Sequence, residues 1–267
     1  MKITAAEIYK SIEHIRAKTP LIHNITNYVV MNNTANALLA IGASPVMIHA
    51  QEEVADMAGM ASALVINIGT ISEPWVKGMF MAFSRAAREG VPVIIDPVGA
   101  GATPYRTRTV RDLIAAEQPA IIRGNASEIM ALTDDALKTR GVDATAGSNE
   151  AVAAAQSISG SRNCVVCISG AVDYVVDRKE VVRIANGHPM MTKVTGLGCT
   201  ASALCGAFAA VEKNPLLAAA KAMAVMGVAG EMAAEKSAGP GSLQMHFLDM
   251  LYNLSEKDIQ ARLKIEV

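Results

Sequence analysis

The chain has 267 residues and carries 24 lysine and arginine residues against 25 aspartate and glutamate residues, a formal net charge of −1. Without an excess of positive charge it cannot hold a polyanion by counterion release, which excludes nucleic acid as an expected partner. A chain of this length can form one large α/β domain, and no change in composition marks a boundary. We therefore expect a single domain over residues 1–267.

Apolar residues make up 51% of the sequence, but aromatic residues make up only 4%. This is more apolar surface than a monomer of this size readily buries, so we expect a homo-oligomer. Residues 1–16 mix charges at helical spacing and do not resemble a signal peptide. The uncharged segment 194–211 is interrupted by glycine, serine and threonine, so no membrane span is expected there. The expected location is the cytoplasm, with no membrane partner.

Local signals predict helices and strands in alternation along the chain. A capping box of Thr4 and Glu7 opens the first helix, which Pro20 stops. A later helix over 74–89 is ended by Gly90. Apolar and β-branched runs predict strands at 21–25, 45–48, 63–68, 91–95, 120–122, 164–168, 173–177 and 181–184.

The order of these elements predicts the fold class. Continuous apolar strands separated by helices are typical of an α/β fold, a mostly parallel central sheet flanked by helices on both faces. The segment 173–184, with its turn at Arg178 and Lys179, predicts a hairpin at the sheet edge. Beyond Cys199 the chain is almost wholly helical, and the one long irregular stretch is predicted around 134–148.

The sequence lacks two common nucleotide-binding motifs. Neither G-x-x-x-x-G-K-[ST] nor a G-x-G-x-x-G after the first strand is present, which disfavours a P-loop kinase and a dehydrogenase of the dinucleotide-binding type. In open parallel sheets, ligands bind beyond the carboxyl ends of the strands, so the residues that follow each predicted strand are the candidates. Three such segments carry groups suited to phosphoryl transfer.

The first segment is Thr195-Gly-Leu-Gly-Cys-Thr200, which precedes a predicted helix over 201–211. Gly196 and Gly198 allow successive backbone N–H groups to point inward as an anion nest, and the helix N-terminus adds partial positive charge. Such a nest would stabilise a transferring phosphoryl group. The pattern alone fits a glycine turn for close helix packing equally well.

The second segment begins with Asp96, directly after a predicted buried strand. An aspartate there can hold Mg²⁺, which neutralises charge on phosphate oxygens, or it can cap the turn before Pro97. The third segment contains Arg123, whose guanidinium suits bidentate phosphate binding. Asn125 and Glu128 follow it with the spacing of a helix capping box, which is a structural alternative to a binding role. Together the three segments supply the parts of a kinase without a P-loop.

These motifs resemble a known family. The glycine nest, Asn125-x-x-Glu128 and Asp96-Pro-Val are similar to the ribokinase-like superfamily of small-alcohol kinases. Within it, the chain resembles the hydroxyethylthiazole kinase family over about residues 20–241. The segments that carry this resemblance are His23-Asn-Ile-Thr-Asn27-Tyr-Val-Val, Gly42-Ala-Ser-Pro-Val-Met47, Asn67-Ile-Gly-Thr70, Asp96-Pro-Val-Gly-Ala-Gly-Ala-Thr-Pro104 and Arg123-Gly-Asn125.

The resemblance implies a ribokinase-like fold and an activity. The activity is Mg²⁺-assisted transfer of the ATP γ-phosphoryl group to the hydroxyl of 4-methyl-5-(2-hydroxyethyl)thiazole, giving the thiazole phosphate used in thiamine synthesis. The resemblance also implies a trimer with substrate sites at subunit interfaces. It assigns ligands to several positions: Met47, Gly196 and Asn27 to the thiazole, Arg123 and Ser169 to ATP, and Asp96 and Glu128 to magnesium.

One position of the catalytic loop 196–199 departs from the wider superfamily. Most of its members have an aspartate as catalytic base at the end of this loop, after Gly196 and Gly198, where this chain has Cys199. A thiol at a helix N-terminus can have a lowered pKa and accept the alcohol proton. Because deprotonation comes late in a loose transition state, we hypothesise instead that Cys199 contributes mostly position and a modest rate effect.

Alternatives of the same fold stay open at this point. One is a kinase for hydroxymethylpyrimidine or pyridoxal, and another is a nucleotide-dependent dehydratase that acts on a damaged nicotinamide cofactor. The segments Asn24-Ile-Thr-Asn27 and Gly42-Ala-Ser-Pro-Val-Met47 are the features that distinguish the thiazole kinases. From a different class, a catalytically silent ATP-binding sensor is disfavoured by the retention of Asp96, Glu128 and Arg123.

Overall fold

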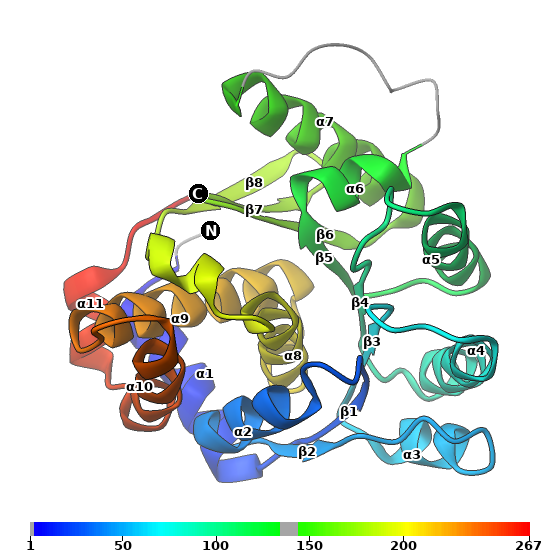
Figure 1. The fold of residues 1–267 in the computed structure, drawn as a ribbon, viewed down its shortest axis with the longest axis horizontal. Helices are drawn as coiled ribbons and strands as arrows, with labels where there is room; N and C mark the ends of the chain where they lie inside the picture. The colour runs from blue at the N-terminus through cyan, green and yellow to red at the C-terminus, as the bar shows by residue number, and fades with distance from the viewer. Residues whose placement is uncertain (1–2, 134–143) are drawn as a thin grey trace.

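The computed structural model describes residues 3–133 and 144–267. In these residues nine strands form one sheet with helices on both sides (Figure 1). The strands are β1 (Leu21–Ile25), β2 (Ser44–Val46), β3 (Ala63–Asn67), β4 (Val93–Asp96), β5 (Ile121–Asn125), β6 (Val165–Ser169), β7 (Asp173–Asp177), β8 (Glu180–Ile184) and β9 (Ile265–Glu266). The predicted α/β class, a mostly parallel sheet between helices, is confirmed.

The strand order is β2-β1-β3-β4-β5-β6-β7-β8-β9. Neighbouring strands from β2 to β6 run parallel, and β6 to β9 pair antiparallel. After β1 the chain goes first to β2 on one side and then to β3 on the other, so the order reverses at β1. Such a reversal separates the connections at the carboxyl ends of the strands and leaves a crevice there.

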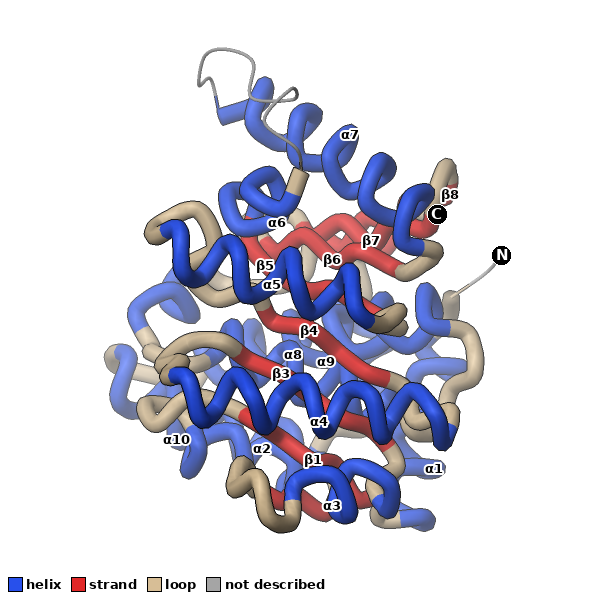
Figure 2. Tube along the Cα trace, turned by 90° about the vertical axis from the view of Figure 1, so that its right-hand side faces the viewer, coloured by secondary structure: helices blue, strands red, loops and turns tan. Residues whose placement is uncertain are grey.

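Helices cover both faces of the sheet (Figure 2) because strand side chains alternate in direction and both sets are apolar. One layer consists of α1 (Ala5–Lys18), α2 (Met31–Ile41), α8 (Leu197–Ala209), α9 (Pro215–Glu235), α10 (Pro240–Asn253) and α11 (Glu256–Arg262). The opposite layer consists of α3 (Val54–Met60), α4 (Glu73–Glu89), α5 (Pro104–Ala116), α6 (Ala126–Leu132) and α7 (Ala144–Arg162).

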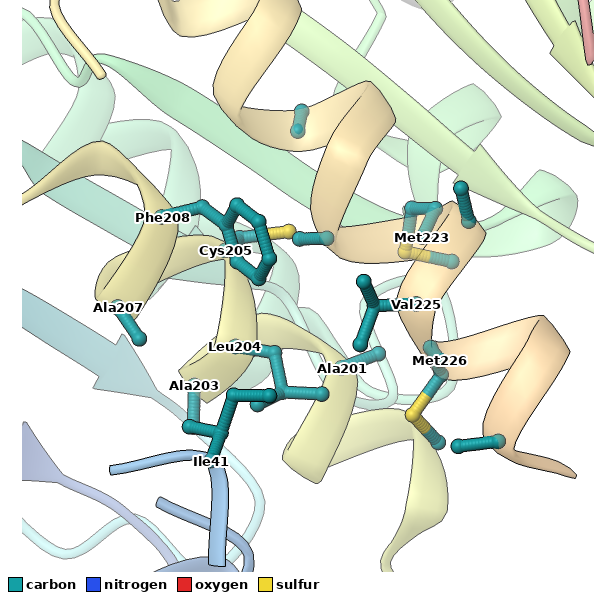
Figure 3. Close-up of a cluster of buried hydrophobic side chains, with 14 of the residues drawn as sticks. Ile41, Ala201, Ala203, Leu204, Cys205, Ala207, Phe208, Met223, Val225 and Met226 are labelled. Atoms are coloured by element: carbon teal, nitrogen blue, oxygen red, sulfur yellow. The ribbon is translucent and has the colours of Figure 1, made fainter. Parts of the chain in front are cut away.

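Helices α8 and α9 form the centre of the larger core. Figure 3 shows side chains from both helices gathered there, among them Phe208, Leu204 and Val225. Within the described ranges, α9 is the one helix long and apolar enough to cross a membrane, and 83% of its 18-residue apolar stretch is buried inside the fold. Its apolar character therefore serves packing against α8 and the sheet.

Most local predictions are confirmed with shifted boundaries. The capping box at Thr4 begins α1, and Gly90 ends α4 in the left-handed region with φ 69°. The predicted hairpin is β7–β8, but β9, which sequence patterns missed because it has two residues, lies outside it at the sheet edge. The predicted irregular stretch was wrong over 144–148, where α7 has begun, and its residues 134–143 lie outside the described ranges.

Candidate active site

A cleft lies at the carboxyl ends of the parallel strands, with a cavity of about 440 Å³. Its lining includes the residue two positions after β1 and the last residues of β4, β5 and β6: Asn27, Asp96, Asn125 and Ser169. Parallel strands place these positions at one edge of the sheet, as the sequence predicted. We call this cavity the strand-end cleft.

Asp96 projects from the end of β4 into this cleft and is 1% exposed. Its Oδ2 accepts hydrogen bonds from Asn67 Nδ2 (2.7 Å) and Ser202 Oγ (2.9 Å). Its Oδ1 is buried without a hydrogen-bond partner among the described residues. The side chain therefore does not cap the turn at Pro97, and that structural alternative was wrong. Burial raises the pKa of this carboxyl to about 6, although the positive charge of Arg123 opposes the shift.

Arg123 stands in β5, one strand further, and is buried despite its charge. Its Nη1 donates to the carbonyl of Gly198 (2.9 Å), and its Nη2 donates to Ser169 Oγ (2.6 Å). The charge of Asp96 raises the pKa of the guanidinium against the effect of burial, which lowers it. Because five N–H groups are available on arginine, donors remain for an anion in the cleft.

The segment predicted as a loop before a helix at 201 begins that helix instead. Gly196 is the N-cap residue of α8, with φ 86°, and Gly198 and Cys199 lie in the first helical turn. A Cβ on Gly196 would lie 2.8 Å from Val30 Cγ1, so both the backbone conformation and the close approach require glycine there. Gly196, Gly198 and Cys199 line the cleft, so the N-terminus of α8 lies at it, and helix N-termini are a general anion-binding feature because their first N–H groups have no partner within the helix.

Cys199 lines the cleft, and its Sγ accepts a hydrogen bond of 3.4 Å from Asn27 Nδ2. Burial raises the pKa of the thiol to about 11, and the negative charge of Asp96 adds to the shift. The possibility of a lowered thiol pKa at the helix N-terminus was therefore wrong. Desolvation and a nearby carboxylate outweigh the partial charge of the helix end.

Glu128 lines the same cleft from α6. It forms the predicted capping box with Asn125, whose backbone N–H donates to Glu128 Oε2 (2.8 Å), while Oε1 accepts from the backbone N–H of Gly99 (2.9 Å). Its charge acts on Asp96 and raises the pKa of that carboxyl. Glu128 therefore shapes two turns of the cleft wall and still keeps carboxylate lone pairs.

The oxygen groups fit Mg²⁺. Asp96 Oδ1 is a buried oxygen without a protein partner, and a second carboxylate, that of Glu128, lies on the same cleft. Within residues 3–133 and 144–267 no cluster of three or more acidic, histidine or cysteine side chains is placed to hold a metal ion. Mg²⁺ commonly takes only one or two carboxylates and completes its shell with water and phosphate oxygens, so this donor set suffices.

One predicted site residue does not reach the cleft. Met47 follows β2 directly, is partly buried, and does not line the strand-end cleft. Two residues to which the sequence analysis assigned no role contribute to the site, because Asn67 and Ser202 donate hydrogen bonds to Asp96. The strand-end rule would have found Asn67, the last residue of β3, whereas no local pattern marks Ser202 inside α8.

A neighbouring cavity of about 570 Å³ shares a wall with the strand-end cleft. Arg123, Ser169 and Gly198 line both spaces. Much of its remaining lining is apolar, from α8 and α9, with Asp173 on the polar side. An apolar cavity with a few polar groups is typical of sites that bind small organic ligands and cofactors.

Arg123 and the N-terminus of α8 can bind negative charge, and the carboxylates of Asp96 and Glu128 can hold a metal that balances it, which is what phosphoryl transfer requires. The fold and the cleft together define a ribokinase-like small-molecule kinase. The model of the hydroxyethylthiazole kinase family matches residues 12–257. The chain belongs to that family.

Individual relatives agree with this assignment. A protein of Syntrophus aciditrophicus described as hydroxyethylthiazole kinase is 60% identical over 266 residues, which cover 99% of this chain and 98% of the relative. A solved hydroxyethylthiazole kinase structure from Pyrococcus horikoshii is 42% identical with a TM-score of 0.89, and the match covers 97% and 98% of the two chains. A ribokinase-like superfamily protein from Enterococcus faecalis, 12% identical with a TM-score of 0.65 over 90% and 89% of the chains, shares the fold alone.

Proposed function

We propose that the chain phosphorylates hydroxyethylthiazole at its hydroxyl in the strand-end cleft, with ATP as co-substrate and Mg²⁺ as the metal. Membership of the family supports the kinase activity and the use of ATP. The observation that carries the assignment of the cleft is the shared wall of Arg123, Ser169 and Gly198. A nucleotide whose base lies in the neighbouring cavity and whose γ-phosphate lies in the cleft would pass these residues.

The phosphate chain is bound by positive groups at this wall. The guanidinium of Arg123 is already oriented by Ser169 and the Gly198 carbonyl, so its remaining N–H groups are held ready for phosphate oxygens. The backbone N–H groups in the first turn of α8, from Gly196 to Cys199, would receive the transferring phosphoryl group. Their partial positive charge acts where negative charge develops in the transition state.

The acceptor alcohol would lie on the other side of the cleft, against Asn27, Gly196 and Cys199. With a pKa of about 11, the Cys199 thiol stays protonated at neutral pH and does not remove the alcohol proton as a thiolate. Asn27 already donates to Cys199 Sγ, so both side chains are held in place. Their contribution would be to position the hydroxyl. In a loose transition state the hydroxyl keeps its proton until the new O–P bond is nearly formed and the bond to ADP is nearly broken, and the proton then passes to an oxygen of the transferred phosphoryl group or to water.

Asp96 and Glu128 would hold Mg²⁺ between them and the nucleotide. When bound, Mg²⁺ supplies charge neutralisation at the β and γ phosphate oxygens. Arg123 lies close enough to Asp96 for its positive charge to oppose the rise that burial causes in the pKa of the Asp96 carboxyl.

We also propose that residues 1–267 work as one domain and assemble as a trimer with sites at the subunit interfaces. One continuous sheet supports the single domain.

Large apolar side chains next to the cleft support the proposed trimer, since Tyr28 is 65% exposed and Val29 is 61% exposed. Met47, placed near the thiazole by resemblance but absent from this cleft, would reach it from a neighbouring subunit. Light scattering coupled to gel filtration measures the mass directly, and a monomer would refute the assembly.

The activity is tested by incubating the purified protein with ATP and Mg²⁺ in two parallel tubes, one with hydroxyethylthiazole and one with hydroxymethylpyrimidine. Mass spectrometry then detects each phosphate monoester. We expect the thiazole phosphate alone. Pyrimidine phosphate as the main product, or ADP without either monoester, would refute the proposed substrate.

A further inference from the structure

A continuous line of side-chain hydrogen bonds crosses the floor of the strand-end cleft. Ser202 Oγ and Asn67 Nδ2 both donate to Asp96 Oδ2, at 2.9 Å and 2.7 Å. Asn67 Oδ1 in turn accepts from Asn27 Nδ2 at 2.9 Å, and the same Asn27 nitrogen lies 3.4 Å from Cys199 Sγ. The line therefore joins the carboxylate proposed for the metal to the thiol proposed for the acceptor.

The orientation of the Asn67 amide follows from a backbone group. The N–H of Gly69 lies 2.9 Å from Asn67 Oδ1, and an N–H can only donate, so the atom facing it must be the amide oxygen. The amide nitrogen consequently faces Asp96. Asn67 is 1% exposed and pairs with Asp96 in the register of β3 and β4, so neither side chain has room to reorient.

We propose that Asn67 and Ser202 are positioning residues, because their hydrogen bonds to Asp96 Oδ2 orient the other oxygen, Oδ1, toward the metal position. Asn67, unlike Ser202, also connects Asp96 to the Asn27–Cys199 pair. Two donors on one oxygen leave the other oxygen, buried and without a protein partner in the described ranges, as the free ligand. This inference rests on the proposed function, which places Mg²⁺ at Asp96.

Substitutions of Ser202 and Asn67 distinguish the effect on metal binding from the effect on acceptor binding. Ser202→Ala removes one hydrogen bond to Asp96 and leaves Asn27 and Asn67 paired. Asn67→Ala removes the second bond to Asp96 and also the acceptor that holds Asn27. Loss of such supporting groups typically weakens metal binding by about 10- to 100-fold. We therefore expect Ser202→Ala to affect the metal alone and Asn67→Ala to affect both the metal and the acceptor.

The direct readout is binding of Mn²⁺, used as a paramagnetic probe and titrated into the protein with ADP while free Mn²⁺ is followed by electron paramagnetic resonance. We expect the dissociation constant to rise about 10-fold or more in both variants. The thiazole KM should rise several-fold only in Asn67→Ala. Asn24→Ala and Thr109→Ala are matched controls, because they remove a buried amide and a buried helical hydroxyl whose hydrogen bonds are to local backbone carbonyls.

Thermal unfolding by circular dichroism accompanies every variant, and if Asn67→Ala fails to fold, Ser202→Ala still tests the metal arm. Mn²⁺ affinities within two-fold of the matched controls would overturn the positioning role. An increase in the thiazole KM that is equal for Ser202→Ala and Asn67→Ala would overturn the link through Asn67. The Mn²⁺ titration needs no turnover, so a wild-type protein that binds Mn²⁺ but does not phosphorylate the thiazole would refute the proposed substrate and the link to the acceptor, and would leave the metal-positioning role of Asn67 and Ser202 standing.

Discussion

Replacing Gly198 by alanine would separate stability from activity. Gly198 lies in the first turn of α8, where alanine is the better helix former by about 0.5–1 kcal/mol. The added Cβ would lie 3.1 Å from Arg123 Nη1, so the guanidinium would have to shift by a few tenths of an ångström. Arg123 is held at that point by the Gly198 carbonyl and by Ser169, and the shift would misalign its remaining donors.

The magnitude follows from the bond that would be lost. One hydrogen bond between a charged guanidinium and phosphate contributes about 1.5–3 kcal/mol, which corresponds to about 10- to 150-fold in kcat/KM for ATP. Steady-state kinetics with varied ATP measures this, and thermal unfolding should show a midpoint equal to or above that of the wild type. Gly160→Ala is the matched control, because Gly160 lies in α7 with open space around its Cβ position. A Gly198→Ala enzyme with unchanged kcat/KM would refute the proposed placement of the phosphates at Arg123.

Three further perturbations test other parts of the molecule. Cys199→Ala should lower kcat by no more than about 10-fold. The kcat of the wild type should stay constant from about pH 7 to 9, because the Cys199 thiol titrates only near its pKa of about 11. A kcat that rises with pH over that range would contradict this. Phe208→Ala, in the core of Figure 3, should lower the free energy of unfolding by about 3–5 kcal/mol in urea titrations, and a loss below about 1 kcal/mol would contradict full burial. Burial would raise the pKa of Glu212, but hydrogen bonds from Lys221 and from backbone N–H groups outweigh that effect and lower the pKa. The ionised Glu212 carboxylate therefore stabilises the folded protein fully above its ordinary pKa of 4.5, and this stabilisation is lost as the pH falls through the lower pKa of the folded state. Glu212→Gln should remove that dependence and destabilise the protein at pH 7, because Lys221, paired with Glu212 at 2.7 Å, would be left buried; equal acid unfolding curves would argue against it.

The positions of the strand ends could be predicted from the sequence because they depend on residues that are close together in the chain. Apolar runs show where each strand stops, and parallel strands bring those ends to one edge, so the sequence alone predicts that Asp96 and Arg123 lie together, while Ser169 was assigned only by resemblance to the family. The same local logic applies to the capping box of Asn125 and Glu128, which depends only on spacing along the chain.

The start of α8 shows where local reasoning fails. Two glycines before residue 199 resemble a loop, because glycine is a poor helix former. In the structure, Gly198 is nevertheless in the first turn of α8, and its missing side chain lets Arg123, 75 residues away in the chain, approach closely. The strand β2, predicted through residue 48, also has an end that a distant segment sets. It ends at Val46 because β1 pairs with it only from Leu21 to His23.

By itself the sequence determined the order of elements, the α/β class and the strand-end candidates, because these depend on periodicity and on neighbours within a few residues. Only the tertiary structure decided how those candidates behave. The free oxygen of Asp96 depends on Ser202, which lies 106 residues away, and the high pKa of Cys199 depends on burial and on the charge of Asp96. Hydrogen bonds and desolvation act between atoms that are close in space, so groups distant in the chain set them and no local pattern records them.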